Sequence, residues 1–150
     1  MTAMRYFTRQ PIPWNRLARL EREVARQPAG ALVTFRGIVR GDQHGPRRVR
    51  AIDYAAYPEM ADAQLERLAS EARARWALTH LQMLHRLGLV EAGQISVLIL
   101  TAAGHRQAAY AASTFLIEQV KHQVPIWKRE LYDDGTSRWV EEEGGEHAHV

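Results

Sequence analysis

The spacing of apolar and polar residues along the chain predicts an alternation of strands and helices. Helices are expected over Pro13–Arg26, from Pro58 to about Trp76, and from Arg106 to about His122. Strands are expected over Ala31–Val39, Val49–Tyr57, Leu81–Leu87, Ile95–Thr101, Ile126–Tyr132 and Arg138–Val140. Residues 95–100 are apolar on both faces of their strand, which predicts a central strand of a sheet.

Glycine and proline mark the breaks between these elements. Gly41–Arg48 contains two glycines, a proline and several charges, and is expected to be a mobile basic loop. Turns are expected at Glu91–Gly93 and Asp133–Gly135. The order ββαββαββ after an N-terminal helix predicts one α+β domain over residues 1–140. The acidic tail Glu141–Val150 is expected to be disordered.

Composition narrows the chemistry that the chain can perform. The 150 residues include no cysteine, which excludes disulfides, thiolate metal sites and a cysteine nucleophile or sulfur carrier on this chain. No apolar run approaches the roughly 20 residues of a membrane helix. Residues 1–10 lack the apolar stretch of a signal peptide, so we expect a cytoplasmic protein. The net charge of +3 is too small to argue for nucleic-acid binding by itself.

The two lysines are the most informative charged residues. Of the 20 basic residues, all are arginine except Lys121 and Lys128, which lie in one short segment. Retained lysines can indicate that an amine is needed rather than a charge, although chance clustering is the alternative. Because a helix end and a turn separate them, both amines could converge on one pocket, where Glu130 could orient one of them. The alternative is a helix C-terminus complemented by positive charge.

Two further segments carry candidate ligand-binding groups. Gly104-His105-Arg106 precedes a helix, and a helix N-terminus with these side chains suits an anion. The alternative is a helix start with two solvated polar residues. Arg36-Gly-Ile-Val-Arg40 could clamp a charged ligand beside the loop, or Arg40 could be a surface charge. His80 and His85 are expected on opposite faces of a strand, so no metal site is expected.

Together, several segments resemble the large, catalytic subunit of molybdopterin synthase, the MoaE family. The resemblance covers about Gly30 to Val140 and includes five pieces in order. They are Gly30-Ala-Leu-Val-Thr-Phe-Arg-Gly-Ile-Val-Arg40, Tyr57-Pro-Glu-Met60, His85-Arg-Leu-Gly88, His105-Arg106, and Lys121 through Val-Pro-Ile-Trp-Lys-Arg-Glu130. The last piece is highly specific for the family.

The resemblance implies a reaction, a partner and a fold. The family converts cyclic pyranopterin monophosphate to molybdopterin with sulfur from the C-terminal thiocarboxylate of a small ubiquitin-like subunit, and no cofactor is expected on this chain. The family assembly is a homodimer with a small partner at each end. Its fold is an α/β hammerhead-type domain with an additional antiparallel β subdomain.

The resemblance also implies residue roles. Lys121 and Lys128 would be the catalytic amines. The pterin or its phosphate would be bound by Ile38, Val39 and Arg40, and the phosphate by His105 and Arg106 of the neighbouring subunit. Arg129 and Glu130 would complete the pocket beside Lys128.

Two other functions remain to be weighed against this one. A non-catalytic module that binds RNA or nucleotides would use Arg47, Arg48 and Arg50, and its affinity would depend steeply on salt. That function does not explain the two lysines on either side of the Val-Pro-Ile-Trp segment. An inactive paralogue would bind the partner without turnover, but the presence of Lys121, Lys128 and His105 argues against it.

Overall fold

The computed structural model describes residues 4–26 and 28–140. Its helices are α1 (Ala18–Val24), α2 (Pro58–Arg75) and α3 (Arg106–Gln123). Its strands are β1 (Phe7–Thr8), β2 (Ala31–Ile38), β3 (Gln43–His44), β4 (Arg47–Ala56), β5 (Leu78–Arg86), β6 (Gly88–Glu91), β7 (Ile95–Ala103), β8 (Ile126–Tyr132) and β9 (Ser137–Trp139).

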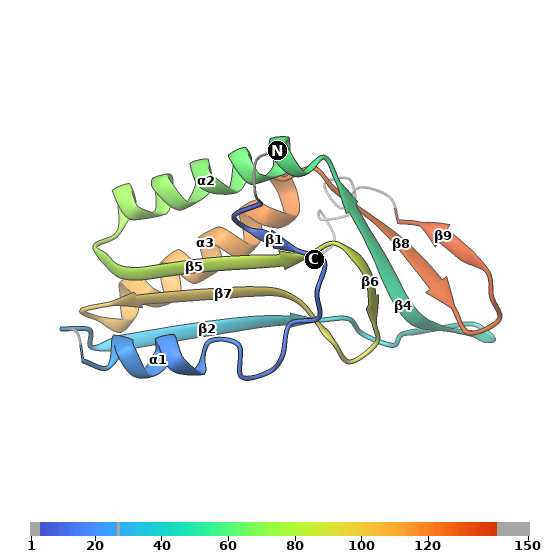
Figure 1. The fold of residues 1–150 in the computed structure, drawn as a ribbon, viewed down its shortest axis with the longest axis horizontal. Coiled ribbons are helices and arrows are strands. Elements are labelled where there is room, and N and C mark those ends of the chain that lie inside the picture. The colour runs from blue at the N-terminus through green and yellow to red at the C-terminus, as the bar shows by residue number, and fades with distance from the viewer. Residues whose placement is uncertain (1–3, 27, 141–150) are drawn as a thin grey trace.

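The strands form two sheets (Figure 1). The main sheet has the order β1-β5-β7-β2, in which β1 is parallel to β5 and the other neighbours are antiparallel. The second sheet has the order β3-β4-β8-β9, and β6 pairs with β4 beside this path. It lies at one end of the main sheet, where β4, β8 and β9 run side by side (Figure 1). This arrangement confirms the predicted α+β class with an added antiparallel sheet.

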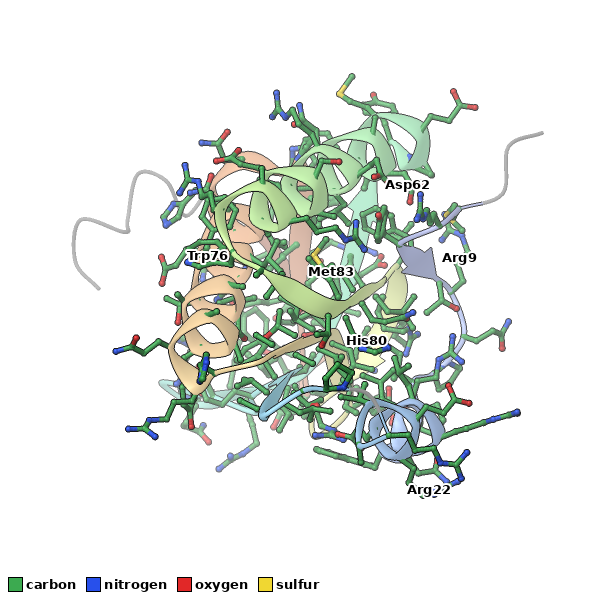
Figure 2. The ribbon with its side chains drawn as sticks, turned by 90° about the vertical axis from the view of Figure 1, so that its left-hand side faces the viewer. Arg9, Arg22, Asp62, Trp76, His80 and Met83 are labelled. Atoms are coloured by element: carbon green, nitrogen blue, oxygen red, sulfur yellow. The ribbon has the colours of Figure 1, made fainter. Side chains whose placement is uncertain are left out.

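Two apolar clusters cover the two faces of the main sheet. The larger one joins α2 and α3 to β5 and β7, with Leu65, Leu116 and Ile99 almost fully buried. The smaller one joins Leu17, just before α1, to the opposite face. Figure 2 shows Met83 on the side of α2 and His80 on the side of α1, as the alternation of side chains along β5 requires. All nine residues of β7 are buried, which confirms the predicted central strand.

Proline and glycine set the helix boundaries. Pro58 is the first residue of α2, where its missing N–H costs no hydrogen bond, and Tyr57 before it is extended. The second long helix, α3, ends at Gln123. Val124 is extended because a residue that precedes proline, here Pro125, is disfavoured in the helical conformation. Both long helices were predicted within about a turn of their observed bounds. The core face of α3 is formed by Ala109, Ala112, Leu116 and Val120, all of which are buried.

Several sequence expectations need correction. The expected loop Gly41–Arg48 contains a tight hairpin, in which Gln43 and His44 pair with Arg48 and Arg47 around Gly45 (φ +62°). The N-terminal helix is shorter than expected, and β1 and β6 were not predicted. These two strands have two and four residues, too few for a periodic pattern to show. The expectation for the tail Glu141–Val150 lies outside the described residues.

Candidate functional site

A cavity of about 560 Å³ lies where the two sheets meet the C-terminal end of α3. Its wall includes residues from β2, β4, β5, β7, α3 and β8. The side chains that matter chemically are Arg36, Arg40, Asp42, Tyr54, His85, Ser96, Lys121, Lys128 and Glu130, with Ile38, Val39, Ile52, Val97 and Val140 among the apolar members. The wall therefore combines four flexible cations with two carboxylates, so it suits an anionic ligand.

Both lysines line this cavity. Lys121 lies in the last turn of α3, and Lys128 is the third residue of β8. The chain reverses between them at Val124 and Pro125, with the Ile126 N–H donating to the Val124 carbonyl at 2.8 Å. The short connection brings two amines seven positions apart in sequence to one cavity.

The pairing of β4 with β8 decides which side chains face the cavity. Tyr54 lies opposite Lys128 and Ile52 lies opposite Glu130, and all four line the cavity. Residues directly opposite each other in an antiparallel pair share one face of the sheet. Arg129, one residue on, therefore lies on the other face.

Arg129 has its own partners on that outer face. Its guanidinium Nη2 lies 3.2 Å from the Asp53 carboxylate, and its charge lies 5.6 Å from the centre of the Trp139 ring. Arg129 is absent from the cavity wall, whereas Glu130 is part of it.

Glu130 is held by a small polar network. The Tyr132 hydroxyl donates to its carboxylate at 2.7 Å, and Arg138 Nη2 donates to the same oxygen at 3.1 Å. His44 Nε2 lies 4.0 Å from the other oxygen. Burial raises the pKa of Glu130, but the bonds from Tyr132 and Arg138 outweigh it, so the pKa lies below its ordinary value. The carboxylate is thus an anion at neutral pH.

The segment after β2 forms the opposite wall. The β2–β7 pairing shifts register between Gly37 and Ile38, and Val39 is then held by hydrogen bonds to Gln94 and Gly93 (3.0 and 2.8 Å). Arg40 Nε lies 2.8 Å from the Asp42 carboxylate, but its side chain is 85% exposed. A side chain so exposed can exchange this partner for a ligand at little cost, since surface ion pairs contribute about 1 kcal/mol or less.

His105 and Arg106 lie at the other end of α3. Arg106 begins the helix that Lys121 helps to end, so the two are roughly 22 Å apart along the axis at 1.5 Å per residue. Neither His105 nor Arg106 lines the cavity of its own chain. The structure thus assembles Ile38, Val39, Arg40, Lys121, Lys128 and Glu130, and leaves His105, Arg106 and Arg129 elsewhere.

Two aromatic residues of the cavity wall, Tyr54 and His85, were given no role there by the sequence reasoning. Tyr54 and His85 are 8% and 7% exposed and both line the cavity. The His85 ring lies edge-on to the Tyr54 ring, with 5.2 Å between their centres. His85 was weighed as a metal ligand and as part of the His85-Arg-Leu-Gly88 segment, but was given no role in the pocket. Its placement depends on which strand packs against β5, which local sequence does not reveal.

The described part of the chain contains neither a cluster of metal-binding side chains nor a membrane-spanning helix. Among residues 4–26 and 28–140, no three His, Asp or Glu side chains are grouped to hold a metal ion. No helix within these ranges has the length and apolar character needed to cross a membrane.

The sequence matches the family described as "MoaE protein" over residues 7–123. This chain belongs to the MoaE family. It is 41% identical over 116 residues to the molybdopterin synthase catalytic subunit of Thermoplasma volcanium, covering 77% of this chain and 84% of that one. The Bacillus subtilis catalytic subunit is 38% identical over 119 residues, covering 79% and 74% of the two chains.

Solved MoaE-family structures share the fold. Molybdopterin synthase from Staphylococcus aureus has a TM-score of 0.79 at 32% identity, covering 93% of this chain and 98% of that one. A complex of subunits 1 and 2 of molybdopterin-converting factor from Helicobacter pylori has a TM-score of 0.78 at 25% identity, covering 93% and 92%. The family assignment confirms the predicted enzymatic function, that of a molybdopterin synthase catalytic subunit in molybdenum cofactor biosynthesis.

Proposed function

We propose that this MoaE-family chain transfers sulfur from the C-terminal thiocarboxylate of a small ubiquitin-like subunit to cyclic pyranopterin monophosphate, which forms the molybdopterin dithiolene. The observation that carries this proposal is the convergence of Lys121 and Lys128 on one cavity. A sulfur-transfer enzyme with no cysteine must receive its sulfur from another molecule. The cytoplasmic location expected from the sequence is part of this proposal.

The charges of the cavity support this substrate class. Thiocarboxylate and phosphate are both anions, and their joint burial is favourable only near several cations. Arg40, Lys121 and Lys128 supply such charges on the wall. In this scheme Lys121 lies beside the incoming partner tail and transfers protons, and Lys128 is the second catalytic amine.

The remaining wall residues would orient the substrate. Arg40, with Ile38 and Val39, would hold the pterin or its phosphate. Glu130 is fixed as an anion by Tyr132 and Arg138 and would keep the Lys128 side of the wall ordered. Arg129 would support the cavity wall from the outer face of β8, where its ion pair with Asp53 joins β8 to β4.

The assembly is part of the same proposal. The Helicobacter pylori relative is described as a complex of two subunits, and we propose a small partner for this chain as well. His105 and Arg106 are too far from the cavity of their own chain to touch a ligand there. They would bind the substrate phosphate in the cavity of a second copy, which makes a homodimer part of the proposal.

The RNA-binding alternative has little support from the loop arginines. Arg47 lies 4.1 Å from the centre of the Tyr132 ring, and Arg48 donates to the Gly41 carbonyl at 3.0 Å. Both side chains thus have contacts within the hairpin and its neighbouring strand. A nucleic-acid surface would need these groups for phosphates.

Reconstitution tests the proposal. The chain is mixed with a thiocarboxylated ubiquitin-like partner and cyclic pyranopterin monophosphate, and the product is detected as its oxidised fluorescent pterin. We expect product with the wild type and with Thr114→Ala, an exposed control on the same helix. For Lys121→Ala we expect a rate loss of about 10²–10³ with the fold intact, the usual cost of one catalytic donor. Near-normal turnover in Lys121→Ala would refute the assigned role.

A further inference from the structure

The imidazole of His85 is fixed in the cavity wall. Its Nδ1 lies 2.7 Å from the carbonyl oxygen of Arg86. A carbonyl oxygen can only accept, so Nδ1 carries the hydrogen and Nε2 carries the lone pair of the neutral ring. The ring is therefore an oriented, uncharged acceptor at a wall otherwise rich in charge.

The His85 ring is connected to Lys128 through Tyr54. The Tyr54 ring meets His85 edge-on at 80°, and Tyr54 lies directly opposite Lys128 in the β4–β8 pairing. Phe7 also packs against the imidazole, with 5.8 Å between ring centres. Phe7, His85 and Tyr54 therefore form a run of ring contacts, and Tyr54 is the register partner of Lys128 on the neighbouring strand.

We propose that His85 is a positioning residue that sets the place of the Lys128 amine in the cavity through its fixed neutral ring. The ring contact of His85 with Tyr54 and the pairing of Tyr54 with Lys128 carry this proposal, together with the joint membership of all three residues in the cavity wall. Its consequence for turnover rests on the proposed function, whereas its consequence for the amine does not.

The electrostatics of the site agree with this role. Burial lowers the pKa of His85 to about 4; its bond to Arg86 opposes that shift, and the charge of Lys128 adds to it. A protonated His85 would add a second cation beside Lys128, and coupling of this kind is mutual. The other titratable or charged wall groups are Arg36 on β2, Arg40 and Asp42 after it, Tyr54 on β4, Lys121 on α3 and Glu130 on β8.

The two lysines make the amine directly observable. Lysine labelled with ¹³C at Cε gives two side-chain signals from this chain, one from Lys128 and one from Lys121. The experiment titrates both signals in the wild type, in His85→Phe and in His80→Phe. His85→Phe keeps a ring but removes both nitrogens, and His80→Phe is the matched control on the α1 side of the same strand.

We expect His85→Phe to move the Lys128 signal, because a neutral polar neighbour becomes apolar. The Lys121 signal should stay in place, and His80→Phe should move neither. An unchanged Lys128 titration in folded His85→Phe would overturn the proposal, and so would an equal change in His80→Phe.

His85→Gln separates a polar role from simple packing. Glutamine supplies a neutral amide with a donor and an acceptor, so its Lys128 signal should lie nearer to wild type than that of His85→Phe. Equal displacement in the two variants would mean that only the ring volume matters, which contradicts the proposal. His85→Gln also provides the readout if His85→Phe does not fold.

Turnover completes the test. In the reconstituted reaction we expect kcat of His85→Phe to fall about tenfold with KM nearly unchanged, since small misplacement of a catalytic group has effects of this size or larger. A rise in KM at constant kcat would contradict a role through Lys128. If the wild type makes no product, the proposed function fails, and the lysine titration still decides the role of His85.

Discussion

The close approach of β2 to the end of β7 provides a sharp test of the packing. Gly30 N–H donates to the Ala103 carbonyl at 2.9 Å, just before β2 begins. A Cβ added to Gly30 would lie 2.2 Å from the Gly104 carbonyl oxygen and 3.2 Å from its carbon. Ordinary contact distances are 3.4–4 Å, so the two backbones would have to separate by about 1 Å.

The cost of Gly30→Ala can be worked out from this geometry. The obstacle is backbone at the connection between β7 and α3, so no side chain can rotate away. Overpacking of this kind costs about 1–3 kcal/mol. The lower entropy of the unfolded alanine chain returns at most about 1 kcal/mol. We therefore expect a net loss of about 1–2 kcal/mol, or roughly 2–8 °C in Tm for a chain of 150 residues.

Urea unfolding of wild type, Gly30→Ala and Gly104→Ala measures this loss. Gly104 is the matched control, because a Cβ there meets nothing within 4 Å and its φ is not positive. We expect Gly104→Ala to stay within about 0.5 kcal/mol of wild type. A loss of the same small size in Gly30→Ala would refute the steric argument, since it would show that the strands can separate freely.

Three further predictions concern charged and polar pairs. Burial, and after it the hydrogen bond to Glu66, raises the pKa of Tyr6 to about 12. The contribution of the neutral Tyr6 hydroxyl to stability is therefore complete below pH 10 and is lost as pH rises from about 10 to 12. Unfolding of Tyr6→Phe should therefore depend less on pH in that range than unfolding of wild type. Because the pKa of Glu130 is lowered in the folded protein, its carboxylate stabilises the fold above the ordinary carboxyl pKa, and this stabilisation is lost as pH falls through the pKa of the folded state. The stability difference between wild type and Glu130→Gln should therefore shrink when unfolding is measured in acid. The Arg129 and Asp53 side chains are 38% and 34% exposed, so a double-mutant cycle should give a coupling below about 1 kcal/mol.

Elements with a long periodic pattern were predictable from the sequence. The two long helices and the buried strand β7 each bury a regular set of residues, such as Leu65 and Leu68 in α2. Short elements were not, because β1 and β6 depend on pairing with distant strands rather than on their own pattern. The hairpin at Gly45 was also not predicted. It has only two residue pairs, Gln43 with Arg48 and His44 with Arg47, and it depends on β4 beginning as early as Arg47.

The candidate site was predictable only in part for the same reason. The unusual retention of Lys121 and Lys128 pointed to one pocket, and both residues line one cavity. His85 and Tyr54 belong to strands that meet only through the packing of the two sheets. Nothing in the local sequence of either strand distinguishes these residues from ordinary core positions.

The parity of β8 explains how one short segment supplies both a cavity wall and an outer face. Successive residues of a strand point to opposite faces, so Lys128 and Glu130 can share the cavity only if Arg129 faces away. The β4 partners repeat this parity, with Tyr54 and Ile52 inside and Asp53 outside. The turn at Val124 and Pro125 sets this register relative to the end of α3 and therefore to Lys121. A shift of one residue in the pairing would move Lys128 to the outer face and bring Arg129 inward. The length of the Val-Pro-Ile-Trp spacer is thus as much a part of the site as the two amines, because it determines that both reach the same cavity.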